Sequence, residues 1–341
     1  MNITFLVGNG FDVNLGLKTK YNEFIEVYKD IPAKNITVHE FKQHIYSNKE
    51  LWVDAELAFG QCTKNYSGHN AAMKVLACHE DFCIELAKYL QSEEEKFALA
   101  YDEELIKKVT SAALRDLKRG FRTEEAEEIQ NFINRVSGGM VYNFITFNYT
   151  TTLDKCIDCV KNDVKTLDNK GNNPNKIGDI VHIHGTTEDD MIFGLNDETQ
   201  IANMEIFKDA EPEILSQIIK IKANTMYKRK KDSIASSLLR LSHIIYVYGM
   251  SLGETDKLWW NRICDMLKQE TALRVIIYSY ETKDFNERLL GARFAIAERK
   301  VKEKLLSYSD LTQQQKQRVM SRIHITTQDI FSGLSNIVKE E

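Results

Sequence analysis

The sequence is poor in several features that mark particular classes of protein. Its 341 residues include only three prolines and no low-complexity tract, so a proline-rich linker between domains is not expected. The six cysteines lack the spacing of a disulfide framework, which is typical of a reducing compartment. No apolar run reaches the roughly 18 residues that a membrane-spanning helix needs, and the pattern of a signal peptide is missing. We therefore expect a cytoplasmic protein without a membrane segment.

The sequence also lacks an excess of positive charge. Lysine and arginine together number 45 against 50 aspartates and glutamates, so the formal net charge is -5. Proteins that bind nucleic acid usually carry a basic surface, which makes nucleic acid a disfavoured partner. With 43% hydrophobic and 28% charged residues, the chain has the composition of a folded globular protein.

What the sequence does contain is a short apolar run at residues 3–7 that ends at Gly8-Asn9-Gly10. A run of this length predicts a buried strand, and the two glycines predict a tight turn before the helical segment that follows. At the carboxyl end of a parallel strand, such a turn lets backbone N–H groups approach a phosphate closely. The third glycine of the dinucleotide fingerprint is missing, so a plain strand-turn-helix remains the alternative.

The next stretch, residues 21–139, contains helical patterns and no good strand. Apolar residues recur near a 3.6-residue period in residues 21–28, 71–90, 105–117 and 126–136. The stretch far exceeds the length of one crossover helix. We therefore predict a helical insertion that covers the mouth of a site, with Trp52, Asp54 and Glu56 turned toward that site.

Short apolar runs resume after residue 139 and alternate with helical patterns. Predicted strands cover residues 141–147, 179–184, 191–193, 243–248, 274–280 and 322–326, and predicted helices cover residues 153–160, 254–267, 285–305 and 329–338. Such alternation predicts a parallel sheet. The expected fold is α/β, a Rossmann-like, mostly parallel sheet wound on both faces. Residues 1–20 and 140–341 form its nucleotide-binding core, and residues 21–139 form the helical insertion after the first strand.

Polar residues and glycines gather where four of the predicted strands end. The carboxyl ends of parallel strands open onto one crevice, so residues that follow different strands can meet there. In chain order they are Gly8, Asn9, Gly10 and Asp12; Thr146, Asn148, Thr150 and Thr151; His182, His184 and Gly185; and Gly249, Ser251 and Gly253. Each has a plain structural alternative as a helix cap, an interior histidine or an ordinary turn. Four such strand ends together favour a ligand site.

Several motifs occur in an order that resembles a known family. They are G-N-G-F-D at 8–12, W-x-D-x-E at 52–56, F-N-Y-T-x-T-L at 147–153, H-I-H-G at 182–185, F-G-x-N-D at 193–197 and Y-G-x-S-L-G-x-x-D at 248–256. With these motifs the chain resembles the AbiH-type abortive-infection proteins of bacterial antiphage defence. That family is in turn distantly similar to sirtuin-like NAD-binding domains, through Gly8-Asn9-Gly10, Thr146-Phe147-Asn148 and His184-Gly185. The paired C-x-x-C motifs of the sirtuin zinc site are missing, so protein deacylation is not expected.

The resemblance implies NAD as the ligand and, if the protein is an enzyme, hydrolysis of NAD to nicotinamide and ADP-ribose. Asn148, His184 and Asp12 are then the expected catalytic residues: Asn148 holds the ribose hydroxyls or water, and His184 accepts a proton. No metal is expected. The expected NAD-binding residues are Gly8, Asn9, Gly10, Phe11, Thr146, Thr150, Gly185, Gly249, Ser251 and Gly253.

Other functions remain open. The protein could bind a nucleotide without cleaving it and act as a sensor or interaction module, with a phage-derived trigger or a second copy of the chain as its partner. A metal-dependent nuclease is the less favoured alternative, because we do not expect both histidines of H-I-H-G to reach one ion. Its ligands would come from His182, His184, Asp189, Asp190, Asp197 and Glu198.

Overall fold

A six-stranded sheet lies at the centre of the computed structural model, which describes residues 1–135, 138–162, 174–280 and 291–339. All strand pairs are parallel, in the order β3-β2-β1-β4-β5-β6. The strands are β1 (Asn2–Val7), β2 (Val141–Thr146), β3 (Lys176–His182), β4 (Ile244–Tyr248), β5 (Arg274–Tyr278) and β6 (Ile323–Thr326). The predicted α/β, Rossmann-like parallel sheet is therefore confirmed. The short strand predicted at 191–193 does not form; nearby, Leu195 makes an isolated bridge to Ile219.

Helices cover both faces of the sheet because side chains alternate along each strand. Phe5 and Val7 of β1 point into one core, and Leu6 points into the other. The first core is closed by α1 (Gly10–Asn14), α6 (Glu103–Arg115), α7 (Thr123–Arg135) and α8 (Thr152–Asp158). The second is closed by α11 (Lys231–Arg240), α12 (Lys257–Gln269), α13 (Gly291–Ser307) and α14 (Gln313–Met320). The part of the predicted helix at 285–290 lies outside the described residues.

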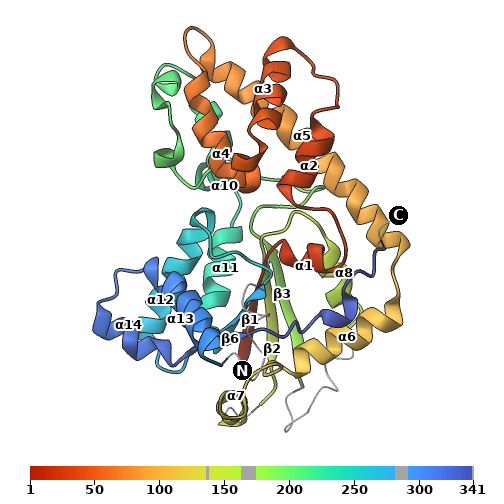
Figure 1. Cartoon of the computed structure of the whole chain (residues 1–341), viewed down its shortest axis with the longest axis vertical. Helices are drawn as coiled ribbons and strands as arrows, with labels where there is room; N and C mark the ends of the chain where they lie inside the picture. The colour runs from red at the N-terminus through yellow and green to blue at the C-terminus, as the bar shows by residue number, and fades with distance from the viewer. Residues whose placement is uncertain (136–137, 163–173, 281–290, 340–341) are drawn as a thin grey trace.

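A third core belongs to a separate group of helices, which we call the helical unit (residues 21–90 and 191–226). It contains α2 (Tyr21–Tyr28), α3 (Ile36–Ser47), η1 (Lys49–Asp54), α4 (Ala55–Cys62), most of α5 (Ala71–Leu99), α9 (Pro212–Ile218) and α10 (Lys220–Met226). Figure 1 shows that the chain starts at the end of β1 far from this unit, so the parallel strands direct their carboxyl ends toward it. The helical unit therefore lies over the end of the sheet where the candidate residues gather.

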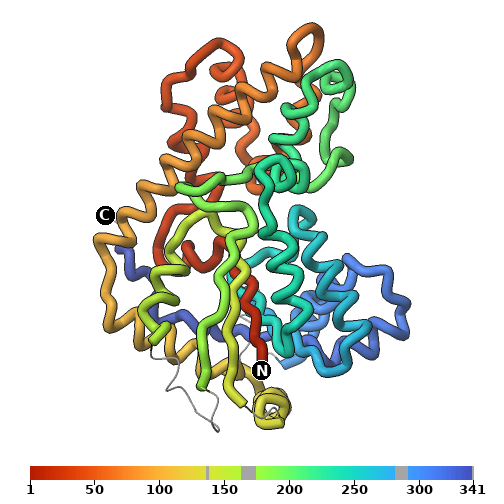
Figure 2. The backbone as a smooth tube through the Cα atoms, turned by 180° about the vertical axis from the view of Figure 1, so that it is seen from behind, coloured from red at the N-terminus to blue at the C-terminus, as the bar shows by residue number. Residues whose placement is uncertain are grey.

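Packing divides the chain differently from the expected boundary at residue 139. Helices α6 and α7 pack on the sheet through Leu114 and Phe132 rather than joining the helical unit. Conversely, Phe193 and Phe207, far along the chain, complete the core of the helical unit. Helix α5 connects the two parts, and its long diagonal course is clear in Figure 2.

The helix predicted at residues 329–338 is wrong. Only the short 3-10 turn η9 (Ser332–Leu334) forms there. The segment instead runs beside α1, where the N–H groups of Asn336 and Val338 donate to the carbonyls of Asn14 and Leu15 at 2.8 and 3.0 Å. Bonds to α1 thus replace the bonds that a helix would make within itself. Among the helices that the structure describes, none is both long and apolar enough to cross a membrane.

Candidate functional site

The glycine loop after β1 packs tightly against the loop after β4. The N–H of Gly10 donates to the carbonyl of Gly249 at 2.8 Å, and the N–H of Phe11 donates to the carbonyl of Gly8 at 3.0 Å. A Cβ on Gly10 would lie 2.5 Å from the Cα of Gly249, whose φ is +66°. The two glycines are thus needed for the close approach of two backbones. A phosphate at this loop would have to displace these bonds or use other donors.

Beyond this loop lies a group of buried polar residues that we call the strand-end cluster: Asp12, Asn148, Thr150 and Thr152. The hydroxyls of Thr150 and Thr152 donate to the two carboxylate oxygens of Asp12 at 2.6 and 2.5 Å. Asp12 is 1% exposed, and this burial raises its pKa to about 6 although both hydroxyls lower it. Asp12 therefore changes its charge close to neutral pH.

Asn148 is the unusual member of the strand-end cluster. Its side chain is buried beside Asp12, yet within the described ranges neither its oxygen nor its nitrogen has a hydrogen-bond partner of normal geometry. Leaving a buried polar group unpaired costs about 1–3 kcal/mol, and most buried amides are paired. The Asn148 amide therefore has an acceptor and a donor available for a ligand or a water molecule.

A second group, which we call the ionic cluster, joins the helical unit to the sheet: Glu56, Lys220, His184 and Tyr149. Lys220, the first residue of α10, lies 2.5 Å from a carboxylate oxygen of Glu56 on α4. The Lys220 ammonium also lies 3.5 Å from Nε2 of His184, which follows β3. The Tyr149 hydroxyl donates to Glu56 at 3.4 Å. A charged pair from two helices therefore contacts, through Lys220, a histidine that follows the sheet.

Burial governs the protonation of the ionic cluster. It raises the pKa of Glu56 to about 7 even though Lys220 opposes the change. Burial, with a smaller contribution from the Lys220 ammonium, holds the pKa of His184 well below its usual range. The His184 imidazole is therefore neutral at physiological pH.

Only one residue of the W-x-D-x-E motif contacts this region directly. Glu56 belongs to the ionic cluster, whereas Trp52 packs on Phe41 and Phe82 inside the helical unit. Asp54 caps α4 by accepting a hydrogen bond from the N–H of Leu57 at 3.1 Å. Sequence reasoning missed Lys220, because a single lysine beside apolar residues carries no pattern that identifies it.

The histidines of H-I-H-G contact different partners. Nε2 of His182 lies 2.8 Å from Asp154, whereas His184 faces Lys220. Residues two apart on a regular strand share a face, but β3 ends at His182 and His184 lies beyond it. In the parts of the chain that the structure describes, no three His, Cys, Asp or Glu residues form a group that could hold a metal ion. The nuclease alternative gains no support from this arrangement.

The remaining predicted residues lie at or after the carboxyl ends of β1, β2, β3 and β4. Asn9 is committed to Thr19, whose hydroxyl donates to its side-chain oxygen at 2.6 Å. Gly185, at φ +75°, allows the chain to turn close to the backbone of Asp190. Thr146, Ser251 and Gly253 follow or end β2 and β4, and Ser251 is exposed. The structure thus brings Asp12, Asn148 and Thr150 together, and it places His184 on the side that faces the helical unit.

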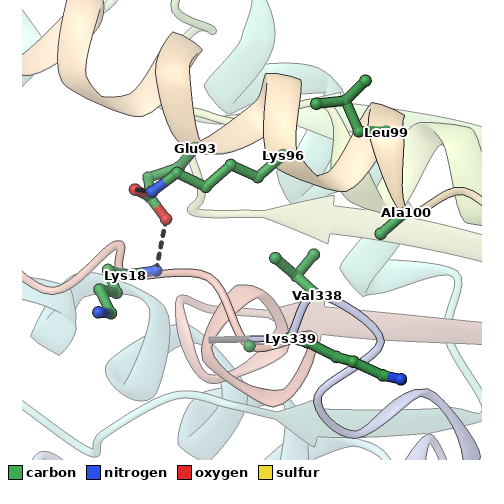
Figure 3. A pocket seen from close by; sticks show the side chains of 8 residues that line it. Lys18, Glu93, Lys96, Leu99, Ala100, Val338 and Lys339 are labelled. Atoms are coloured by element: carbon green, nitrogen blue, oxygen red, sulfur yellow. Dashed lines mark hydrogen bonds and ion pairs between the residues drawn. The ribbon is translucent and has the colours of Figure 1, made fainter. Parts of the chain in front are cut away.

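A surface pocket of about 470 Å³ is lined by other residues than those of the strand-end cluster. Figure 3 shows it between the end of α5, the loop after α1 and the C-terminal segment, with Lys18, Lys96 and Lys339 around it. Glu93 on this side accepts a hydrogen bond from the N–H of Lys18 at 2.8 Å. The next residue, Glu94, instead accepts bonds from the N–H and hydroxyl of Thr151 at 2.6 and 2.7 Å. Neighbouring glutamates of α5 thus have different roles: Glu93 lines the pocket, whereas Glu94 binds the segment after β2.

Comparisons with known proteins identify the family of this chain. No curated protein and no solved structure matches the chain significantly. The sequence pattern of the family described as bacteriophage abortive infection AbiH matches residues 4–278, which include the strand-end cluster and the ionic cluster. Because this match covers most of the 341 residues, the chain belongs to the AbiH family of bacteriophage abortive-infection proteins.

Proposed function

We propose that this protein acts in abortive infection by binding NAD at the carboxyl ends of β1, β2 and β3 and hydrolysing it to nicotinamide and ADP-ribose. The observation that carries the proposal is the buried Asn148 amide, which lies beside Asp12 and, in the described part of the chain, makes no side-chain hydrogen bond of normal geometry. An amide offers both an acceptor and a donor, and a ribose diol needs both. The position of this site, at the carboxyl ends of a wound parallel sheet, agrees with where such folds bind nucleotides.

The reaction places modest demands on the protein. Nicotinamide is bound to the ribose as a cation, so it leaves with the electron pair of the broken bond as a neutral molecule and needs no acid. Water then bonds to the ribosyl carbon and releases a proton. The site has to hold the ribose, exclude bulk water and accept that proton. Asn148 would hold the ribose hydroxyls or the water, and Asp12, with a pKa of about 6, can take up a proton near neutral pH.

The helical unit would contribute by covering the strand ends. Glu56 and Lys220 are 9% and 7% exposed at their side chains, so water is largely excluded where the helical unit meets His184. Electrostatic interactions strengthen when water is excluded. The same closure also supports a sensor, in which a bound nucleotide changes how the helical unit sits on the sheet.

The test is to incubate the purified protein with NAD and to separate nicotinamide, ADP-ribose and cyclic products. We expect nicotinamide release, lowered about 100-fold in Asn148→Ala, since removing one aligned polar group commonly costs that much. Asn22→Ala is the matched control, because Asn22 is exposed on α2 and should leave the rate unchanged. Binding of NAD without release of nicotinamide would support the sensor instead. Absence of both binding and release would refute the proposal.

A further inference from the structure

The contact between Lys220 and His184 restricts what the histidine can do. Within the described residues, the hydrogen bond from the Lys220 ammonium to Nε2 is the one that the His184 ring makes. Rings pack around the imidazole: the centroid of Phe147 lies 5.7 Å from that of His184, and that of Tyr149 lies 6.3 Å away. The ring orientation is therefore set by packing on its sides and by one ammonium at its edge.

An ammonium group has three donors and no acceptor. The imidazole nitrogen that faces it must present a lone pair, because an N–H in that position would point one donor at another. A neutral imidazole carries a single hydrogen, so the other nitrogen, Nδ1, must hold it. Glu56 holds Lys220 in place, since the two side chains form a buried ion pair. Lys220 and Glu56, which belong to the helical unit, thus determine which nitrogen of His184 carries the hydrogen.

We propose that Lys220 is a positioning residue that fixes His184 in the tautomer with its hydrogen on Nδ1, so that the ring donates a hydrogen bond to the substrate instead of accepting a proton from it. The identity of that substrate rests on the proposed hydrolysis of NAD, but the tautomer does not. This assignment changes the role expected for His184 from the sequence. It leaves Asp12 as the carboxylate that receives the proton of the attacking water.

The first experiment reads the tautomer without any substrate. Protein labelled with [15N]histidine is examined by long-range proton–nitrogen NMR near pH 7.5, and His184→Gln identifies the signals of this ring by their loss. We expect hydrogen on Nδ1 in the wild type. The double variant Glu56→Gln/Lys220→Met removes both charges of the pair, and we expect its ring to adopt the tautomer with hydrogen on Nε2, which free histidine prefers.

The second experiment tests whether the reaction requires a hydrogen-bond donor at position 184. A glutamine side chain can donate a hydrogen bond but cannot accept a proton at neutral pH. We expect His184→Gln to retain nicotinamide release within about tenfold of the wild type, whereas His184→Ala should lose about 100-fold or more, as for removal of one aligned donor. Circular dichroism and thermal unfolding check that each variant is folded.

The outcomes separate the two proposals. A wild-type ring with hydrogen on Nε2, or a tautomer unchanged in the double variant, overturns the role of Lys220. Equal losses in His184→Gln and His184→Ala overturn the donor role. A wild-type protein that releases no nicotinamide refutes the proposed hydrolysis, and the NMR spectra still decide what Lys220 does.

Discussion

Two buried carboxylates near the strand ends are stabilised in different ways. Asp12 accepts hydrogen bonds from the hydroxyls of Thr150 and Thr152, which lie in the segment after β2. Glu56 is paired with a lysine and lies in the helical unit. Neutral hydroxyls tolerate either charge state of a carboxyl, because a hydroxyl can donate or accept. An ammonium favours the ionised state, because opposite charges attract. We therefore expect the strand-end cluster to keep its structure when its protonation changes, whereas the ionic cluster should lose its strongest attraction when Glu56 takes up a proton.

The largest expected effect comes from breaking the ion pair on one side. Lys220→Met leaves Glu56 buried without its partner, and we expect the free energy of unfolding to fall by about 3–5 kcal/mol at pH 8. Urea unfolding followed by circular dichroism measures this change. The loss should be smaller at pH 5, because Glu56 can then take up a proton and become neutral.

The double variant Glu56→Gln/Lys220→Met is the control for this experiment. It removes both charges, so it should be clearly more stable than Lys220→Met alone. If the double variant were as unstable as the single one, the loss would not come from an unpaired Glu56, and the contrast between the two clusters would fail.

The next effect is a pH dependence of stability due to Asp12. Its pKa is raised from 3.8 to about 6 in the folded protein. Between these values the folded state keeps a proton that the unfolded state has released, so the free energy of unfolding decreases as the pH rises through this range. The decrease is up to about 3 kcal/mol, at about 1.4 kcal/mol per pKa unit. Unfolding titrations from pH 4 to pH 7 should show a smaller decrease in Asp12→Asn than in the wild type; identical slopes would contradict the assignment.

A substitution in the glycine loop tests whether the close contact between the loops after β1 and β4 stabilises the fold. In Gly10→Ala the new Cβ meets the backbone of Gly249 at 2.5 Å, so we expect a loss of about 1–3 kcal/mol in the free energy of unfolding. Gly253→Ala is the matched control, because its nearest neighbouring atom lies at 3.5 Å. Thermal unfolding should show a clear decrease for the first variant and little change for the second. Equal midpoints would mean that the two loops are not in close contact.

The smallest effect concerns a single hydroxyl. Thr150→Val removes one donor to Asp12 while keeping the shape of the side chain, and we expect a loss of about 1 kcal/mol. Because the hydroxyl lowers the pKa of Asp12, its removal should also raise that pKa further. Thr150→Ser, which keeps the hydroxyl, should preserve the pKa. NMR titration of the Asp12 carboxyl measures both, and a lower pKa in Thr150→Val would refute the role of this hydrogen bond.

The sequence alone determined the sheet and where its polar residues gather. Residues 3–7, 244–248 and 275–278 are mostly apolar runs that predict buried strands, because both faces of a wound parallel sheet are covered. The glycines and short polar residues that follow these runs marked the strand ends, because a turn also depends on a few neighbouring residues. Asp12, Asn148 and Thr150 could therefore be named in advance as neighbours.

Only the tertiary structure decided which groups act on these residues. Nothing local identifies Lys220, since its position against Glu56 and His184 depends on the packing of α4 and α10 over the end of β3. The C-terminal residues fail to form the predicted helix for a similar reason: bonds to α1, more than 300 residues away in sequence, satisfy their backbone instead. Hydrophobic runs and turn residues act over a few positions and can be seen in a sequence, whereas burial of a charge beside its partner arises only when distant segments are brought together.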